Sequence, residues 1–201
     1  MGNSPNLTTG PLAASIILTG APGSGKGTQA SILARRRSLP HLSTGDLFRS
    51  HIARGTELGR AAQRHIDAGH YVPDEVTNAM VRDHIERTAP DGRIILDGFP
   101  RTRAQVDFLD TLLTDVVVLN LVVEPAELLR RLEHRATVGG RSDDAAEVVR
   151  ERLALYAVES EPVLAAYRDR GLLRDLDGAG ELHAVARRID EALATLPAAS
   201  C

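Results

Sequence analysis

The chain has 201 residues, of which 43% are hydrophobic, and a net charge of −3, so it can bury a core as a single domain. The mixed charges give no basic field for nucleic acid, and the longest apolar stretch, 116–123, is too short to cross a bilayer. The single cysteine, Cys201, excludes an internal disulfide and a Cys-rich zinc site. We therefore predict a cytoplasmic protein that binds neither nucleic acid nor a membrane, with flexible tails at residues 1–11 and 197–201.

The first predicted elements are a strand over residues 14–19 and a helix over 26–37. Between them lies a glycine-rich turn, so that residues 20–29 read GAPGSGKGTQ. Backbone N–H groups of such a loop, together with the N-terminus of the following helix, bind phosphate. Lys26, inside this motif, is the only lysine of the chain. The order of strand, loop and helix predicts a nucleotide phosphate site and disfavours a simple turn.

Three short helices are predicted next, after a brief extended piece at 41–42. They cover about 43–54, 57–68 and 74–88, each with a start or stop signal such as Pro73 or Gly69. They precede the next strand, at 93–97, and therefore predict a helical subdomain over the carboxyl edge of the sheet. Asp97 ends that strand, where a carboxylate beside a phosphate loop can hold Mg²⁺ or its water shell; a plain strand-end turn is the alternative.

The second half continues the alternation of helix and strand. We predict a helix at 103–113, a buried strand at 116–122, a helix from Pro125, a glycine linker at 137–140, and a long helix from Asp144 to about 170, kinked or broken at Pro162. A last strand at 172–173 precedes a helix at 181–195. Its core side would be formed by Leu182, Val185, Ile189 and Leu193. The pattern predicts an α/β fold: a five-stranded parallel sheet with helices on both faces.

Six arginines fall at loop or helix positions near the expected site. They are Arg49, Arg101, Arg131, Arg135, Arg141 and Arg152. Each alone is best explained as a surface charge. As a set, they are suited to holding two polyphosphates face to face, because the negative charge must be neutralised before the reacting oxygens approach.

Four motifs together resemble those of adenylate kinases, within the nucleoside monophosphate kinase family. They are residues 20–29, STGD at 43–46, DGFPR at 97–101 and RSDD at 141–144, and the resemblance covers about residues 14–195. The general phosphate-loop pattern has Ser or Thr directly after the lysine, whereas this chain has Gly27. A Gly-Thr pair is normal in the adenylate kinases.

The resemblance implies a role for each matched residue. The ATP phosphates and adenine would be bound by Gly23, Ser24, Gly25, Lys26, Gly27, Thr28 and Arg131. The acceptor AMP would be bound by Thr44, Arg49, Val72, Gly98, Arg101, Gln105, Arg141 and Arg152. The catalytic positive charges would come from Lys26, Arg101, Arg135, Arg141 and Arg152. Asp97 would hold Mg²⁺ through water.

The resemblance also implies a domain plan and a reaction. A kinase domain over 12–196 would comprise a P-loop NTPase core (12–42, 75–135 and 142–196), a nucleoside monophosphate (NMP)-binding helical insert (43–74) and a short lid (136–141). Long bacterial forms carry a lid of about thirty residues, often with zinc, so this chain resembles the short form without zinc. It is expected to be a monomer that binds ATP, AMP and ADP, with a cis Phe99-Pro100 bond.

The expected reaction is reversible phosphoryl transfer from Mg-ATP to AMP, giving two ADP. Thr102 stands where UMP/CMP kinases tend to carry Asn, which favours AMP. Two alternatives stay open: a kinase for UMP, CMP or a deoxynucleotide, and a nucleotide-binding regulator without catalysis. A GTP-dependent switch is excluded because its Asn-Lys-x-Asp motif needs a second lysine.

Overall fold

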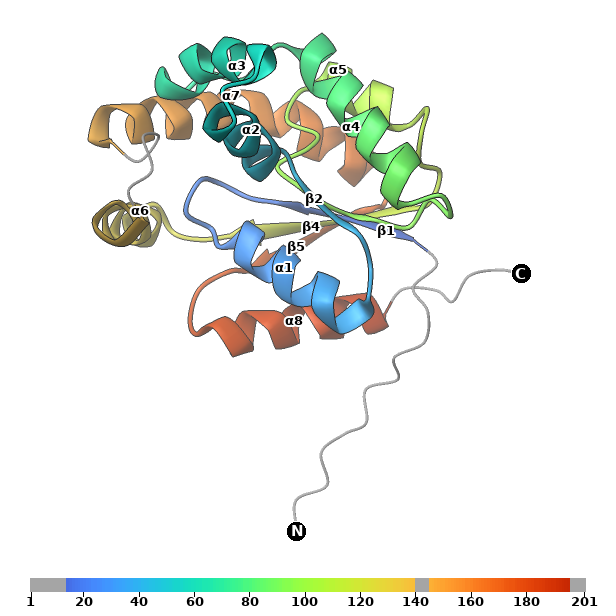
Figure 1. Ribbon diagram of the computed structural model, residues 1–201. Helices are drawn as coiled ribbons and strands as arrows, with labels where there is room; N and C mark the ends of the chain where they lie inside the picture. Colours follow the sequence, from blue (N-terminus) through green and yellow to red (C-terminus); the bar gives the residue numbers. More distant parts are fainter. Residues whose placement is uncertain (1–13, 140–144, 196–201) are drawn as a thin grey trace.

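Five parallel strands form the central sheet of the computed structural model, which describes residues 14–139 and 145–195 (Figure 1). They are β1 (Ser15–Thr19), β2 (His41–Ser43), β3 (Ile95–Asp97), β4 (Val116–Val122) and β5 (Leu173–Asp177), in the spatial order β2-β3-β1-β4-β5. The apolar runs of β1 and β4 are buried, as expected for strands covered on both faces. The predicted five-stranded parallel sheet is confirmed.

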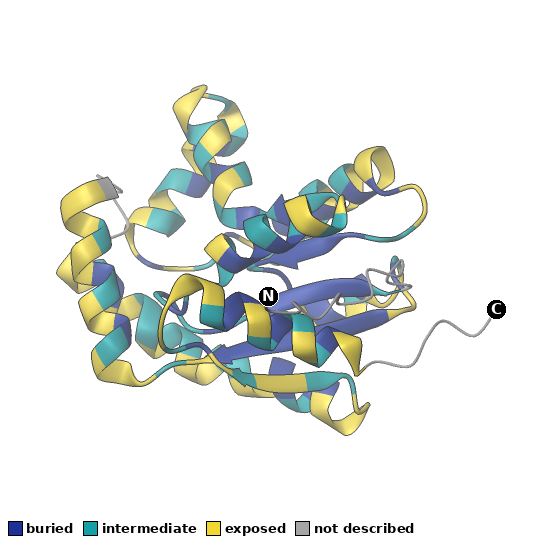
Figure 2. Cartoon of the chain, turned by 90° about the horizontal axis from the view of Figure 1, so that it is seen from below, coloured by how far each residue is buried: buried dark blue, intermediate teal, exposed yellow. Residues whose placement is uncertain are grey.

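Helices cover both faces of this sheet (Figure 1). On one face, α1 (Lys26–Arg37) and α8 (Leu182–Ala194) pack against an apolar cluster that includes Leu33 and Ile189. On the other, α4 (Asp74–Thr88), α5 (Arg103–Leu109) and α7 (Ala146–Asp169) enclose a second cluster around Tyr167. Figure 2 shows the buried strands between helices whose outer sides are exposed. Within the described ranges, no helix is long and apolar enough to span a membrane.

The helical insert begins with α2 (Thr44–Ala53) and α3 (Glu57–Asp67). Both have the N-caps that short polar side chains provide: Ser43 accepts from the N–H of Asp46 at 3.4 Å, and Thr56 accepts from the N–H of Gly59 at 3.0 Å. A small apolar cluster of its own holds the insert together, formed by Phe48, Ala62 and Val72 with the partly buried Ile66, Val76 and Met80. The insert therefore has a core separate from those on the two faces of the sheet.

Three predicted segments differ in the structure. Helix α6 (Pro125–Gly139) extends through most of the expected linker, because one terminal glycine costs little; the Thr137 hydroxyl donates to the carbonyl of His134 at 2.7 Å within it. Helix α7 is not broken at Pro162; the carbonyl that Pro162 leaves without a donor belongs to the exposed Val158, where water can reach it. Leu182 begins α8 and is half exposed, so it is not a core residue.

Element ends account for the remaining differences. Strand β3 starts two residues later than predicted, α5 ends four residues earlier, and β5 extends to Asp177. The residue before α7 is Ala145, which makes no side-chain cap bond; the predicted cap, Asp144, lies outside the described residues. The Phe99-Pro100 bond is cis, as the family resemblance implied.

A buried hydroxyl gives a test of the core. The Tyr167 hydroxyl has no hydrogen-bond partner in the described part of the chain, so Tyr167→Phe should leave the free energy of unfolding unchanged or raise it by up to about 1 kcal/mol. Ser15→Ala is the contrasting variant, because the Ser15 hydroxyl donates to the carbonyl of Gly92 and accepts from the N–H of Ile94. It should lower the free energy by about 1–3 kcal/mol. Chemical denaturation measures both changes. A clear decrease in the free energy of unfolding of Tyr167→Phe would contradict the assignment of the Tyr167 hydroxyl as unpartnered.

Candidate active site

The phosphate loop joins the carboxyl end of β1 to the start of α1. Lys26 is the first residue of the helix, and its Nζ lies 3.4 Å from the carbonyl oxygen of Ala21, so the side chain folds back over the loop. The first turn of α1 has no acidic residue. The positive end of the helix dipole and the lysine therefore face the same region, with no carboxylate in the first turn of the helix itself, which suits an anionic ligand.

Asp97 lies directly beside this loop. It ends β3, is 7% exposed, and pairs in register with Leu18 of β1. A Cβ atom added at Gly27 would lie 3.0 Å from Asp97 Oδ2, so the glycine leaves room for the carboxylate to lie close to the loop. Asp97 Oδ1 is buried and has no partner within the described ranges. An unpartnered carboxylate oxygen in this position fits Mg²⁺ or its bound water.

Lys26 lies among other cations. Burial lowers the pKa of Lys26 from 10.5 to about 8; Asp97 opposes this shift, and the positive charges of Arg101, Arg152 and Arg135 add to it. The structure therefore brings these three predicted arginines within electrostatic reach of the lysine. A phosphate placed among them would relieve the repulsion.

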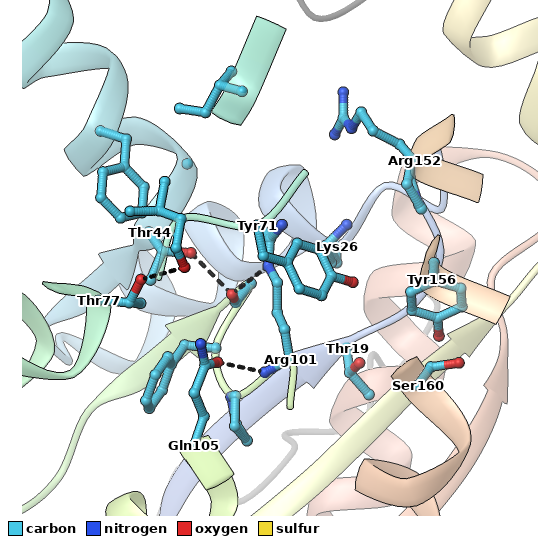
Figure 3. A pocket seen from close by; sticks show the side chains of 18 of the residues that line it. Thr19, Lys26, Thr44, Tyr71, Thr77, Arg101, Gln105, Arg152, Tyr156 and Ser160 are labelled. Atoms are coloured by element: carbon cyan, nitrogen blue, oxygen red, sulfur yellow. Dashed lines mark hydrogen bonds between the residues drawn. The ribbon is translucent and has the colours of Figure 1, made fainter. Parts of the chain in front are cut away.

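Arg101 is held in place from several sides (Figure 3). Its Nε donates to the carbonyl of Gly98 at 2.7 Å, and its guanidinium lies 5.1 Å from the ring centre of Tyr71. Gly98 has φ +75, and a Cβ there would come within 2.7 Å of Arg101 Nη2, so only glycine fits. The Thr44 hydroxyl donates to the same carbonyl at 2.9 Å. Arg101 thus has a fixed position without a bound phosphate.

One cavity gathers most of the predicted acceptor residues. It is lined by Lys26, Thr44, Arg49, Val72, Gly98, Arg101, Gln105 and Arg152. Arg49 pairs with Asp46 at 2.6 Å, and the Val72 carbonyl accepts from the Thr77 hydroxyl at 3.3 Å. Arg141 lies outside the described residues. Thr28, on α1, is exposed and does not line this cavity.

Arg131 lies on the other side of the phosphate loop. Its guanidinium donates to the carbonyls of Ser24 at 3.4 Å and Gly178 at 3.2 Å, and its Nε donates to Glu127 at 2.7 Å. Hydrogen bonds from Arg130 and Arg131 lower the pKa of Glu127 to about 2. Arg131 therefore joins α6 to the phosphate loop and to the loop after β5.

Tyr71, Tyr156 and Ser160 are among the cavity residues that the sequence analysis missed. Tyr156 follows Arg152 by one helical turn, so its place on the same side of α7 was a usable signal. Burial raises the pKa of Tyr156, whereas hydrogen bonds with Thr19 and Ser160 lower it. Its hydroxyl thus connects α7 to the end of β1, just before the phosphate loop.

Comparison with known proteins identifies the family to which this chain belongs. The family model for adenylate kinase matches residues 18–172. The chain belongs to the adenylate kinase family. It is 47% identical over 183 residues to the adenylate kinase of Thermobifida fusca, covering 89% of this chain and 97% of that protein. The adenylate kinase of Nocardioides sp. is 45% identical over 188 residues, with 90% and 98% covered, and that of Kocuria rhizophila is 47% identical over 184 residues, with 89% and 97% covered.

Membership confirms the resemblance on which the site roles were assigned, and makes the chain a phosphotransferase of a family that uses Mg-ATP. The match includes the end of β1, the phosphate loop, the insert and all of α7. The individual roles of Lys26, Arg101 and the other site residues are proposals, which we develop below.

The lowered pKa of Lys26 predicts a proton change on nucleotide binding. Without ligand, Lys26 loses its proton above about pH 8. Bound phosphates favour the ammonium form and raise this pKa, so binding of Mg-ATP at about pH 9 should take up a proton at Lys26. At pH 7 this uptake should vanish, because Lys26 is already charged. Calorimetry in two buffers of different ionisation enthalpy measures the proton uptake. If the wild type and Lys26→Met took up the same number of protons at pH 9, the assignment of this uptake to Lys26 would be contradicted.

Proposed function

We propose that this chain transfers the γ-phosphoryl group of Mg-ATP reversibly to AMP, giving two ADP. The observation that carries the proposal is the gathering of Arg101, Arg135 and Arg152 around Lys26, where a cavity runs from the phosphate loop to the helical insert. A site for one nucleotide would need only the loop and Lys26. A second phosphate, bound next to the first, would account for Arg101, Arg135 and Arg152.

Positive charge and positioning would perform the catalysis. The attacking group is an oxygen of the AMP phosphate, which is already an anion, so no strong general base is needed. Arg101 would hold this phosphate in line with the γ-phosphoryl group while Lys26 follows the group that moves. Arg135, Arg152 and, from outside the described residues, Arg141 would balance the charge of the transition state.

Asp97 would hold the magnesium ion through bound water, using the oxygen that lacks a protein partner. When bound with ATP, the ion neutralises charge on the phosphate oxygens. Gly23, Ser24, Gly25, Gly27 and Thr28 would surround the donor phosphates. Arg131 would lie against the donor adenine from its position between the carbonyls of Ser24 and Gly178.

The acceptor base would occupy the cavity beneath the insert. Thr44, Gln105 and the backbone of Val72 would contact the adenine, and Arg49 would assist Arg101 with the phosphate. The insert (43–74) and the lid (136–141) would close over the substrates, so that water cannot replace AMP as acceptor. Residues 136–139 of this lid are the last turn of α6. A monomeric state, a cytoplasmic location and independence from zinc stay predictions.

The direct test is a coupled assay of Mg-ATP with a panel of acceptors: AMP, UMP, CMP and dAMP. We expect the highest kcat/KM with AMP. A higher value with UMP or CMP would replace AMP by that acceptor. No transfer to any of the four would make the chain a nucleotide-binding regulator.

Lys26→Met should lower kcat by at least about 100-fold, because it removes the charge that follows the transferred group. Arg36→Met is the matched control, since Arg36 lies on the same helix with a half-exposed side chain paired to Asp190 at 2.8 Å. The control should keep normal turnover. Steady-state kinetics with circular dichroism separates lost catalysis from lost folding; near-normal kcat in Lys26→Met would refute the role.

Arg101→Ala should raise the KM for AMP and lower kcat, each by about tenfold or more, while changing ATP binding much less. Arg103→Ala is the control, because Arg103 is exposed and pairs only with Asp107 at 3.0 Å among the described residues. Initial rates at varied AMP and varied ATP measure the two effects. Equal losses for both nucleotides would argue against Arg101 as an acceptor ligand.

A further inference from the structure

We propose that Asp74 is a positioning residue that fixes the side-chain amide of Gln105 in one orientation, and that this fixed amide makes the acceptor site select adenine over hypoxanthine. The inference rests on the proposed function, in which Gln105 contacts the acceptor base. The inference concerns Asp74, which the sequence analysis placed only at the start of the predicted helix 74–88.

The contacts form a short network between α4 and α5. Asp74 Oδ1 accepts a hydrogen bond from Gln105 Nε2 at 2.6 Å, and Asp74 Oδ2 accepts from the Thr102 hydroxyl at 2.7 Å. The Thr102 oxygen also caps α5 by accepting from the N–H of Gln105 at 3.2 Å. Asp74 therefore reaches Gln105 both directly and through Thr102.

The other end of the Gln105 amide is held by the backbone. Gln105 Oε1 accepts from the N–H of Arg101 at 2.7 Å (Figure 3). Both partners of the amide have one role only: a carboxylate can accept but not donate, and a backbone N–H can donate but not accept. Turning the amide over would set oxygen against carboxylate and N–H against N–H.

Burial makes this orientation costly to reverse. Gln105 is 2% exposed, so water cannot easily replace either partner if the amide turns over. A buried polar group without its partner is destabilising, and the bond to the charged carboxylate is stronger than one between neutral groups. Gln105 therefore presents a fixed order of donor and acceptor to the cavity that it lines.

That order has a consequence for base selection. After these contacts, the amide has one N–H and one oxygen lone pair left for a ligand. Adenine offers an acceptor at N1 and a donor at its 6-amino group, whereas hypoxanthine offers a donor at N1 and an acceptor at O6. A fixed amide can match only one of these two edges, while an amide that turns over freely can match both.

The test compares AMP with IMP, which differ at this edge alone. Asp74→Asn keeps the shape of the side chain, but its amide can either donate or accept, so the orientation of Gln105 then depends on the Arg101 N–H alone. Because one of the two constraints is lost, we expect the ratio of kcat/KM for AMP to that for IMP to fall at least about threefold, with kcat for AMP changed less than about threefold and the KM for ATP unchanged. Asp83→Asn, an exposed position on the same helix, should keep the wild-type ratio.

Asp74→Ala is the second variant, since it removes the carboxylate altogether, and its ratio should fall in the same direction. Calorimetric binding of AMP and IMP to every variant tests the selection separately from catalysis. A wild type that binds AMP over IMP without transferring phosphate would refute the proposed function and leave the Asp74 inference standing. AMP-to-IMP ratios within about twofold of wild type in both Asp74 variants, measured at a temperature where each is folded, would overturn the inference.

Discussion

Repulsion among cations is the constraint on which the site depends. Lys26 is half-buried and lies in electrostatic reach of Arg101, Arg135 and Arg152, with Asp97 as the opposing charge. Such a cluster is unfavourable without an anion, so the fold must hold it in place by other means. The stacking of Arg101 on Tyr71, its bond to the Gly98 carbonyl and the anchoring of α7 by Tyr156 provide this support. Binding of phosphate among these cations, as proposed, would recover the energy of holding them together.

Because the strands of the sheet are parallel, the two halves of the proposed site lie at the same edge of the sheet. Strand β1 lies at the centre of the order β2-β3-β1-β4-β5, and its carboxyl end leads into the phosphate loop. Its neighbour β3 ends at Asp97, in register with Leu18, and continues into the segment that holds Gly98 and Arg101. Adjacent parallel strands thus deliver the phosphate loop and the residues proposed to bind the acceptor to the same edge.

The sequence could predict those features that depend on residues close together in the chain. The bounds of α1 and β4 and the N-cap Ser43 follow from nearby residues, and the site residues followed from family motifs. The helix features that were missed depend on small effects. The end of α6 reflects the low cost of one terminal glycine, and the exposure of Leu182 reflects its place as the first residue of α8. Helix α7 continues through Pro162, where the freed carbonyl belongs to the exposed Val158. The hydrogen bond between Asp74 and Gln105 joins residues that are 31 positions apart, and no local sequence pattern predicts it.

The single lysine has a chemical consequence beyond phosphate binding. Since Lys26 carries the only side-chain amine of the chain, an amine-directed reagent would find only this residue and the N-terminal amine. The lowered pKa gives Lys26 a larger neutral, nucleophilic fraction near neutral pH than an ordinary lysine has. Acylation or carbamylation of side chains in this protein would therefore be confined to its phosphate loop, and a nucleotide bound there would shield the Lys26 amine but not the N-terminal amine.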